Sequence, residues 1–89
     1  MLDLKDLRCF VSVYERKGFA RAATELKTVQ SNISARIRRL EDELGAPPFD
    51  RLHRGSRPTA KGEIMYKYAT RVLTEVSELE AAMRDRQVA

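Results

Sequence analysis

Apolar residues recur at helical spacing in four segments of this chain, and short breaks separate the segments. The first segment runs from about Leu4 to Lys17. Its apolar side chains fall three and four residues apart, which predicts an amphipathic helix: Leu4, Leu7, Phe10, Val11 and Tyr14. Asp3 is placed to cap its first turn, Asp6 to complete a capping box, and Gly18 to end the helix.

The next two segments predict a pair of helices joined by a brief turn at Lys27-Thr28. The shorter helix, Phe19 to Leu26, has small residues on its apolar face, which let another helix approach closely. For the longer helix, from about Val29 to Leu44, we expect Thr28 as the N-cap and Gly45 as the stop. Its buried stripe is Ile33, Ile37, Leu40 and Leu44. Such a pair is typical of a helix-turn-helix, here over about residues 19–38.

The outer face of this longer helix changes character along its length. The side chains that point directly away from the apolar stripe are Ser31, Ala35, Arg38 and Asp42. The first half of the outer face is polar, the middle is basic, and the end, residues 41–43, is acidic. An ordinary solvated helix favours acids first and bases last, because of its dipole. The reversed order indicates another use, in which the polar first half faces base edges and phosphates.

Proline and glycine interrupt the helical pattern from Ala46 to Thr59. Two very short strands are predicted, at residues 49–51 and 56–57, around a turn at His53-Arg54-Gly55. A ribbon this small needs an anchor, and Phe49 can supply it. After a helix-turn-helix, such a basic hairpin is a wing, with Arg54 at a tip suited to a minor groove or to phosphate.

The fourth segment predicts a long helix that begins after a Thr59 cap and runs to about Arg84. A heptad seam follows it through Met65, Ala69, Val72, Val76, Leu79 and Met83. A second apolar edge is expected to face the preceding helices, and it consists of Ile64, Tyr68 and Leu73. Because a helix with two apolar edges needs two partners, we expect the seam to pair with the same helix of a second copy.

The net charge of the chain belongs to its first two-thirds. Residues 1–59 hold 12 basic and 8 acidic side chains, whereas residues 60–89 hold five of each, so the first part carries the whole +4. The basic residues are densest from Lys27 to Lys61, where most are arginines, which suit forked contacts with phosphate and guanine. A solvated helix face and loop is the alternative interpretation.

Length and composition narrow the classes of function. Eighty-nine residues make one small domain, and one cysteine with one histidine can build neither an internal disulfide nor a zinc site. With no paired carboxylates on an inward face and no glycine-rich phosphate loop, we expect no enzyme and no cofactor in this chain. No apolar run reaches the roughly 20 residues of a membrane span, and the charged N-terminus is unlike a signal peptide. We therefore expect a cytoplasmic protein with no membrane partner.

With its elements in this order, the sequence resembles the N-terminal DNA-binding region of LysR-type transcriptional regulators over essentially all 89 residues. The helices match as Leu4-x-x-Leu7-x-x-Phe10-x-x-Val13, as Phe19-x-x-Ala22-Ala23-x-x-Leu26, and as Gln30-Ser31-Asn32-Ile33-Ser34-x-x-Ile37-x-x-Leu40-Glu41-x-x-Leu44-Gly45. The wing and the start of the long helix match as Phe49-x-Arg51-x-x-Arg54-Gly55 and Thr59-x-x-Gly62.

The resemblance implies a mainly α fold. A winged helix-turn-helix of three helices and a small two-stranded wing (about residues 48–58) would occupy residues 1–59, followed by a linker and dimerisation helix over residues 60–89. The family's C-terminal effector-binding domain is absent from these residues, so we expect them to be part of a longer regulator. For that full-length regulator, the resemblance implies a small-molecule effector, and it allows assembly into a tetramer and contacts with RNA polymerase.

The resemblance also implies DNA contacts from the start of the third helix and from the wing, and position and charge add further cations to them. The complete set is Gln30, Ser31, Asn32, Ser34, Arg36, Arg38, Arg51, Arg54, Thr59 and Lys61.

The predicted function is sequence-specific binding of double-stranded DNA by a homodimer on an inverted repeat, as a transcription regulator. The two recognition helices would enter successive major grooves, with the wings on the minor groove or backbone. The alternative is a coiled-coil protein-interaction module with an incidental basic face, but the charge partition and the order of side chains along the third helix argue against it. RNA binding would call for exposed aromatics that stack on unpaired bases, which this sequence lacks.

Overall fold

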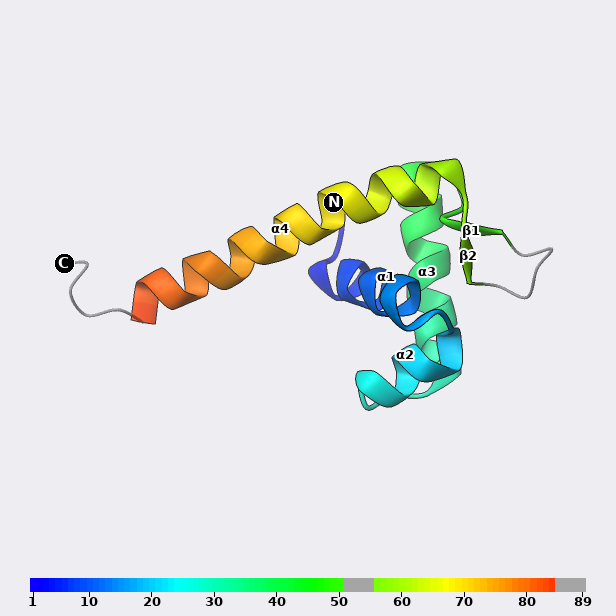
Figure 1. The fold of residues 1–89 in the computed structure, drawn as a ribbon, viewed down its shortest axis with the longest axis horizontal. Helices are drawn as coiled ribbons and strands as arrows, with labels where there is room; N and C mark the ends of the chain where they lie inside the picture. Colours follow the sequence, from blue (N-terminus) through cyan, green and yellow to red (C-terminus); the bar gives the residue numbers. More distant parts are fainter. Residues whose placement is uncertain (51–55, 85–89) are drawn as a thin grey trace.

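The computed structural model describes residues 1–50 and 56–84, and this part of the chain forms four helices and one two-stranded sheet. The helices α1 (Leu4–Arg16), α2 (Phe19–Glu25) and α3 (Gln30–Leu44) pack together, and α4 (Ala60–Arg84) begins on them and extends away (Figure 1). The strands β1 (Phe49–Asp50) and β2 (Arg57–Pro58) are antiparallel, with Phe49 opposite Pro58. The predicted winged helix-turn-helix followed by a long helix is confirmed.

The end of α1 differs from the prediction, because a lysine and not a glycine adopts the left-handed conformation. Lys17 has a φ of 60°, and its N–H donates to the Val13 carbonyl over 2.9 Å. Gly18, expected to end the helix, is extended with a φ of 174° and precedes α2. A left-handed lysine costs about 1–2 kcal/mol, so other contacts must hold this corner.

A side-chain cluster across the corner supplies those contacts. Glu25 of α2 accepts hydrogen bonds from the buried Ser12 hydroxyl and from Arg16, whose Nε lies 2.8 Å from Oε2. These bonds lower the pKa of the Glu25 carboxyl. The end of α1 is thereby tied to the last turn of α2.

The start of α3 also differs from the prediction. The N-cap is Val29, whose side chain makes no capping bond, while the carbonyl of Val29 accepts from the N–H groups of Asn32 and Ile33. Thr28, the predicted cap, lies one residue too early, and its hydroxyl accepts a 3.1 Å hydrogen bond from the Asn32 side chain. At the other end, Gly45 stops the helix with a φ of 74°, as predicted.

The core lies between α1, α2 and α3, and it also anchors the wing. Phe10, Ile33 and Leu40 are completely buried. The ring of Phe49 in β1 packs against Phe10 and Phe19, with centroid distances of 5.4 and 5.9 Å. Burying one such ring contributes about 1.5–3 kcal/mol, so Phe49 is the anchor that the two-residue strands require.

The first turns of α4 are fastened to α1 through two tyrosines. The rings of Tyr14 and Tyr66 stack, with centroids 3.8 Å apart and planes 7° apart. Each phenol donates to a carboxylate of the opposite helix: Tyr14 to Glu63, and Tyr66 to Glu15 over 2.6 Å. The bond to Glu15 raises the pKa of Tyr66 to about 12.

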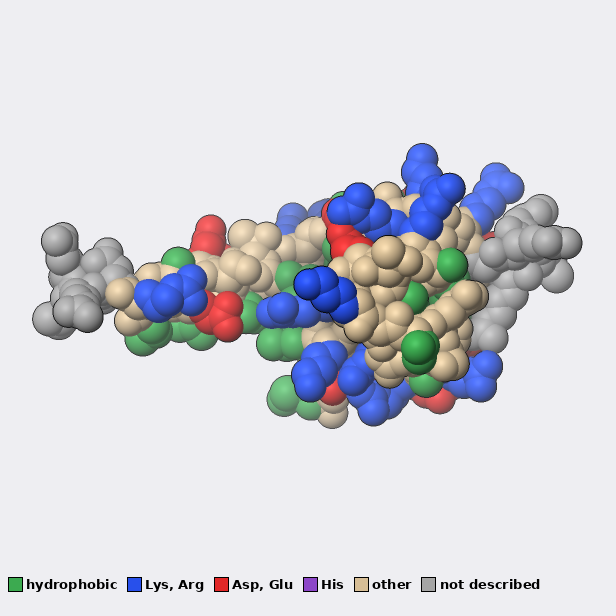
Figure 2. Space-filling view, turned by 90° about the horizontal axis from the view of Figure 1, so that it is seen from below, with side chains coloured by type: hydrophobic (Ala, Val, Ile, Leu, Met, Phe, Trp, Pro, Cys, Tyr) green, Lys and Arg blue, Asp and Glu red, His purple; other side chains and the backbone are tan. Residues whose placement is uncertain are grey.

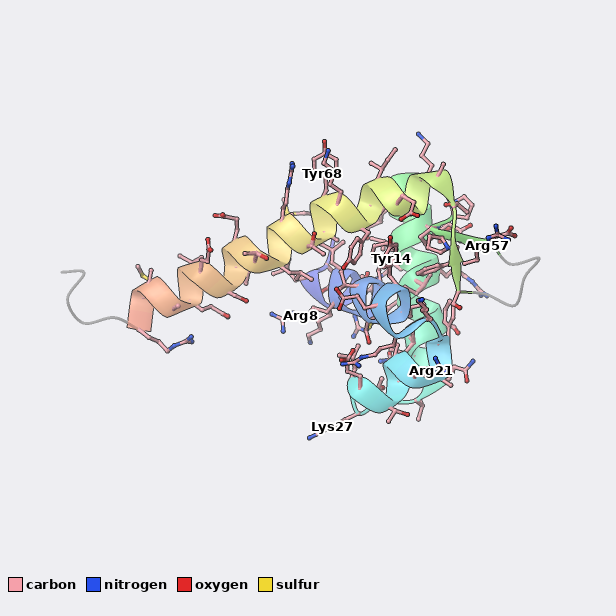
Figure 3. The ribbon with its side chains drawn as sticks, viewed as in Figure 1. Arg8, Tyr14, Arg21, Lys27, Arg57 and Tyr68 are labelled. Atoms are coloured by element: carbon pink, nitrogen blue, oxygen red, sulfur yellow. The ribbon has the colours of Figure 1, made fainter. Side chains whose placement is uncertain are left out.

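The two apolar edges of α4 are not divided as the heptad pattern predicted. Ala69 is 3% exposed and Met65 is partly buried, and both pack on the core of their own domain. Ile64 and Tyr68, expected to face that core, are 53% and 54% exposed, and Tyr68 points away from the other helices (Figure 3). The predicted inner edge is correct only for Leu73. The path of α4 across α1 decides which of its residues contact the core, and these residues do not follow the heptad pattern.

Candidate nucleic-acid interface

The polar face of α3, which we define as Gln30, Ser31, Asn32 and Ser34, lies at the beginning of the helix next to α2. Gln30 and Ser31 are exposed, and Asn32 and Ser34 are partly exposed. Val29 stands beside them with 64% of its surface exposed. Four short or flexible polar side chains without a formal charge, at the open end of an exposed helix, can donate to and accept from base edges.

Of the three arginines in the middle of α3, one is exposed toward solvent and two bond to α1. Arg38 is exposed, and within the described residues it forms no salt bridge. Arg36 and Arg39 both bond the carboxylate of Asp6, with Nη1 of Arg36 at 3.0 Å and Nε of Arg39 at 2.9 Å. Arg36, predicted as a DNA contact, is thus placed in an intramolecular ion pair.

Asp6 was expected to complete a capping box, but it serves as the acceptor for these arginines. Its side chain is 1% exposed. Burial acts to raise its pKa, but the hydrogen bonds and charges of Arg39 and Arg36 outweigh burial and hold the pKa below the usual 3.8. Asp3 caps α1 as predicted, because its carboxylate accepts from the Lys5 N–H over 2.8 Å.

The wing lies beside the start of α4, and the structure describes part of it. Arg57 in β2 is exposed at this end of the molecule (Figure 3). Two of the predicted contacts, Arg51 and Arg54, lie outside the described residues. Sequence reasoning left Arg57 out of the expected contacts, although its place in the densest basic stretch was a signal for it.

Thr59 and Lys61, the remaining predicted contacts, differ in how free they are. The Thr59 hydroxyl donates to the Pro47 carbonyl over 2.7 Å and accepts from the Gly62 N–H over 3.0 Å, which makes it the predicted cap of α4. Lys61 is exposed in the first turn of the helix, as its second residue. The hydroxyl of Thr59 therefore has a structural task, whereas Lys61 is available to a partner.

Basic side chains are distributed unevenly over the molecule. Seen from below, Lys and Arg gather over the end that α1, α2 and α3 form, and they are sparser along α4 (Figure 2). Arg8, Arg21 and Lys27 belong to this end and are exposed (Figure 3). Exposed cations therefore lie at the same helical end of the molecule as the polar face of α3.

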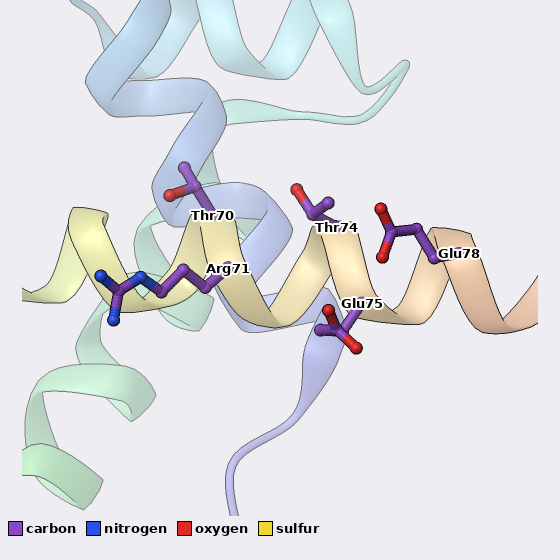
Figure 4. A pocket seen from close by; sticks show the side chains of 5 residues that line it. All are labelled: Thr70, Arg71, Thr74, Glu75 and Glu78. Carbon is purple, nitrogen blue, oxygen red and sulfur yellow. The ribbon is translucent and has the colours of Figure 1, made fainter.

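The described residues hold no group of His, Cys, Asp and Glu that could bind a metal ion, and none of their helices could cross a membrane. A hollow on α4 is lined by Thr70, Arg71, Thr74, Glu75 and Glu78, all from one helix (Figure 4). With a single wall, this hollow is a strip of open helix surface.

The chain was compared with known families, proteins and structures. Residues 4–63 match the family model of the bacterial regulatory helix-turn-helix protein, lysR family. The chain is 42% identical over 86 residues to the HTH-type transcriptional regulator CzcR of Bacillus cereus, and 40% identical over 81 residues to BenM of Acinetobacter baylyi. These matches cover 97% and 88% of the chain but only 30% and 26% of the two relatives, so the chain spans less than a third of their length.

Solved structures agree with these matches. The structure of the BenM DNA-binding domain with catB site 1 DNA has a TM-score of 0.90 and 32% identity, over 98% of both chains. Full-length BenM has a TM-score of 0.87 and 34% identity, over 93% of this chain and 27% of that one. The family model covers well over half of the sequence, and the chain therefore belongs to the LysR family of bacterial regulatory helix-turn-helix proteins, which are regulators and not enzymes.

Proposed function

We propose that this chain binds double-stranded DNA sequence-specifically, as the DNA-binding part of a bacterial transcription regulator in the cytoplasm. The observation that carries the proposal is the polar face of α3, which is uncharged and exposed or partly exposed, at the end of the molecule where Lys and Arg gather. Similarity to a domain solved with DNA supports it. A small-molecule effector and contacts with RNA polymerase would belong to the longer regulator.

In the proposed complex, the start of α3 enters the major groove. Gln30 and Asn32 carry amides that can bond two atoms on the major-groove edge of one base, so they are the proposed sequence readers. Ser31 and Ser34 add shorter contacts, and Arg38 and Lys61 contact the phosphates on either side. From the wing, Arg51, Arg54 and Arg57 would meet the minor groove or the backbone, and Thr59 would hold the wing against α4.

We further propose that two copies pair through α4. The apolar side chains exposed on α4 are Ile64, Tyr68, Val72, Leu79 and Met83, with the predicted seam residue Val76 partly exposed beside them. Such a stripe is unusual on a monomer, and an identical stripe about a two-fold axis covers it. Of the predicted seam, Met65 and Ala69 drop out because they pack on their own domain. A two-fold dimer then matches an inverted repeat.

The first test is selection of bound duplexes from a random pool. We expect an enriched inverted repeat with half-sites about one helical turn apart. Log affinity should fall steeply with log salt, and unrelated duplexes should bind far more weakly. A shallow salt dependence without a preferred duplex would instead support the interaction module.

Two kinds of variant separate sequence reading from phosphate binding. Replacing Gln30 or Asn32 with Ala should change the preferred base and cost about 1–3 kcal/mol on the selected duplex. Arg54→Ala should weaken binding to every duplex alike. If the Gln30 and Asn32 variants both keep the parental preference, the polar face of α3 does not read the sequence.

Leu79→Glu tests the pairing of α4. A carboxylate in the exposed stripe should oppose the apolar contact, so sedimentation should shift to the monomer. Glu78→Gln is the matched control, since it changes a neighbouring exposed polar residue. An unchanged sedimentation coefficient for Leu79→Glu would remove this stripe from the dimer.

A further inference from the structure

Four charged side chains form an electrically balanced cluster between α1 and the middle of α3: Asp3, Asp6, Arg36 and Arg39. Both oxygens of Asp6 are occupied, because Arg39 donates to them through Nε and Nη2 at 2.9 and 3.0 Å and Arg36 donates to one of them at 3.0 Å. Asp3 lies farther out, 3.2 Å from Arg39 and 3.9 Å from Arg36. The carboxylate of Asp6 is 1% exposed, so it is the inner member of the cluster.

The cluster lies next to the proposed DNA-reading residues. Arg36 and Arg39 follow Asn32 by four and seven residues, so all three lie on one flank of α3. Along the helix axis, Arg36 is about 6 Å and Arg39 about 10.5 Å from Asn32. A groove that receives α3 brings a phosphate backbone along each flank of the helix. The reach of an arginine side chain would let either guanidinium meet that backbone, if Asp6 did not hold both toward α1.

Resting on the proposed function, we propose that Asp6 is a specificity-determining residue that withholds Arg36 and Arg39 from the DNA backbone. Phosphate contacts add affinity for every sequence equally and carry no sequence information. Two more cations beside the polar face of α3 would therefore strengthen binding to unrelated DNA and narrow its difference from the selected site. The ion pairs to Asp6 reduce the cationic surface that the recognition helix presents.

If Asp6 had a purely structural role, the expected change in DNA affinity would be the opposite. If Asp6 only fastened α1 to α3, removing its charge would loosen α3 and weaken binding to all duplexes. If Asp6 withholds the arginines, Asp6→Asn leaves Asp3 as the remaining ion-pair partner of both guanidiniums within the described residues, and releases at least one of them. Binding to unrelated DNA should then become tighter and more dependent on salt.

The experiment measures the affinity of the parent chain and of Asp6→Asn for a mixed-sequence duplex and for the selected duplex, between 50 and 200 mM salt. For each additional phosphate that the variant neutralises, the slope of log affinity against log salt should steepen by about 0.9, which adds about a 3.5-fold loss of affinity over this range. The ratio of selected to mixed-sequence affinity should fall. Glu78→Gln is the matched control: it raises the net charge equally but changes an exposed residue of α4 away from α3, and should leave the slope unchanged.

Two further variants identify the source of the effect. Adding Arg36→Gln and Arg39→Gln to Asp6→Asn should restore the parental slope. In the parent background, the same two changes should leave the slope unaltered, because neither arginine contacts DNA there. This second comparison does not depend on the folding of Asp6→Asn.

Three results would overturn the inference: a slope in folded Asp6→Asn that is unchanged or shallower, a slope that stays steep without the two arginines, or a shallower slope when they are removed from the parent. A parent chain that shows no preferred duplex would overturn the proposed function instead. The two failures are therefore distinguishable.

Discussion

Gly62→Ala is expected to destabilise the domain although alanine is the better helix former. Gly62 is buried in the first turns of α4, directly against Pro48 at the start of the wing. A Cβ atom added there would lie 2.0 Å from the Pro48 carbonyl oxygen and 3.0 Å from its carbonyl carbon. Since backbone and not a side-chain tip stands in the way, the helix and the loop must separate.

The size of the effect follows from this geometry. An ordinary contact begins at 3.4 Å, so the two segments must part by about 1.4 Å. Overpacking of this kind costs about 1–3 kcal/mol. The movement also stretches the 3.0 Å bond from the Thr59 N–H to the Pro48 carbonyl, which is worth about 0.5–1.5 kcal/mol. The higher helix propensity of alanine offsets about 0.8–1.0 kcal/mol of this cost, which leaves a net loss of stability of about 0.5–3.7 kcal/mol.

Urea and thermal unfolding followed by circular dichroism measure this loss, at one fixed protein concentration because a dimer's Tm depends on concentration. A domain of this size loses about 4–8 °C in Tm for each kcal/mol. Gly18→Ala is the control, since its added Cβ would meet only the Arg21 side chain at 3.7 Å, and it should cost less than about 1 kcal/mol. If Gly62→Ala is as stable as the parent or gains the propensity term, the close approach to Pro48 does not constrain the fold.

Three other properties can be checked directly. Cys9 is buried and burial raises the pKa of its thiol, so a thiol reagent should react slowly with the native chain and at full rate in urea; equal rates would contradict its burial. The pKa of Asp6 is held below 3.8, so the ionised carboxylate stabilises the fold fully above that pH, and this stabilisation is lost as the pH falls through the lower native pKa. The stability of Asp6→Asn should therefore depend less steeply on pH in acid. Identical acid titrations of parent and variant would refute the ion pairs. The pKa of Tyr66 is raised to about 12, so its bond to Glu15 stabilises the fold fully below about pH 10 and is lost as the pH rises toward 12. Tyr66→Phe should remove the phenol that ionises last in an absorbance titration. An unchanged titration would assign that pKa to another tyrosine.

The sequence predicted those parts of the fold that depend on local spacing. The buried residues Ile33, Ile37 and Leu40 of α3 follow from periodicity, and the stop at Gly45 follows from the preference of glycine for positive φ. Leu44, predicted for the same buried stripe, is 42% exposed because the helix ends there. Phe49 was identified as the anchor of the wing because two short strands cannot be stable alone. In each case, one residue type answers one local requirement.

The errors arose where tertiary contacts decide between similar local choices. Lys17 takes the left-handed position beside an available glycine, because the bonds of Ser12 and Arg16 to Glu25 fix the corner. Arg36 was assigned to DNA from its charge and position, but Asp6, thirty residues earlier, could not be recognised as its partner by spacing alone. The path of α4 over its own domain likewise decides that Ala69 is buried and Tyr68 exposed.

The stacked tyrosines at the root of α4 make the rest of that helix a lever. From Leu73 to Arg84 the helix continues about 16 Å beyond its last contact with the core. Arg84 lies about 27 Å along the axis from the Tyr14–Tyr66 joint, so a tilt of about 10° there would move the far end by about 5 Å, more than the rise of one base pair. The two phenol–carboxylate bonds therefore fix the angle between α1 and α4. A small change in that angle becomes a larger displacement at the far end of α4, where a second copy would attach.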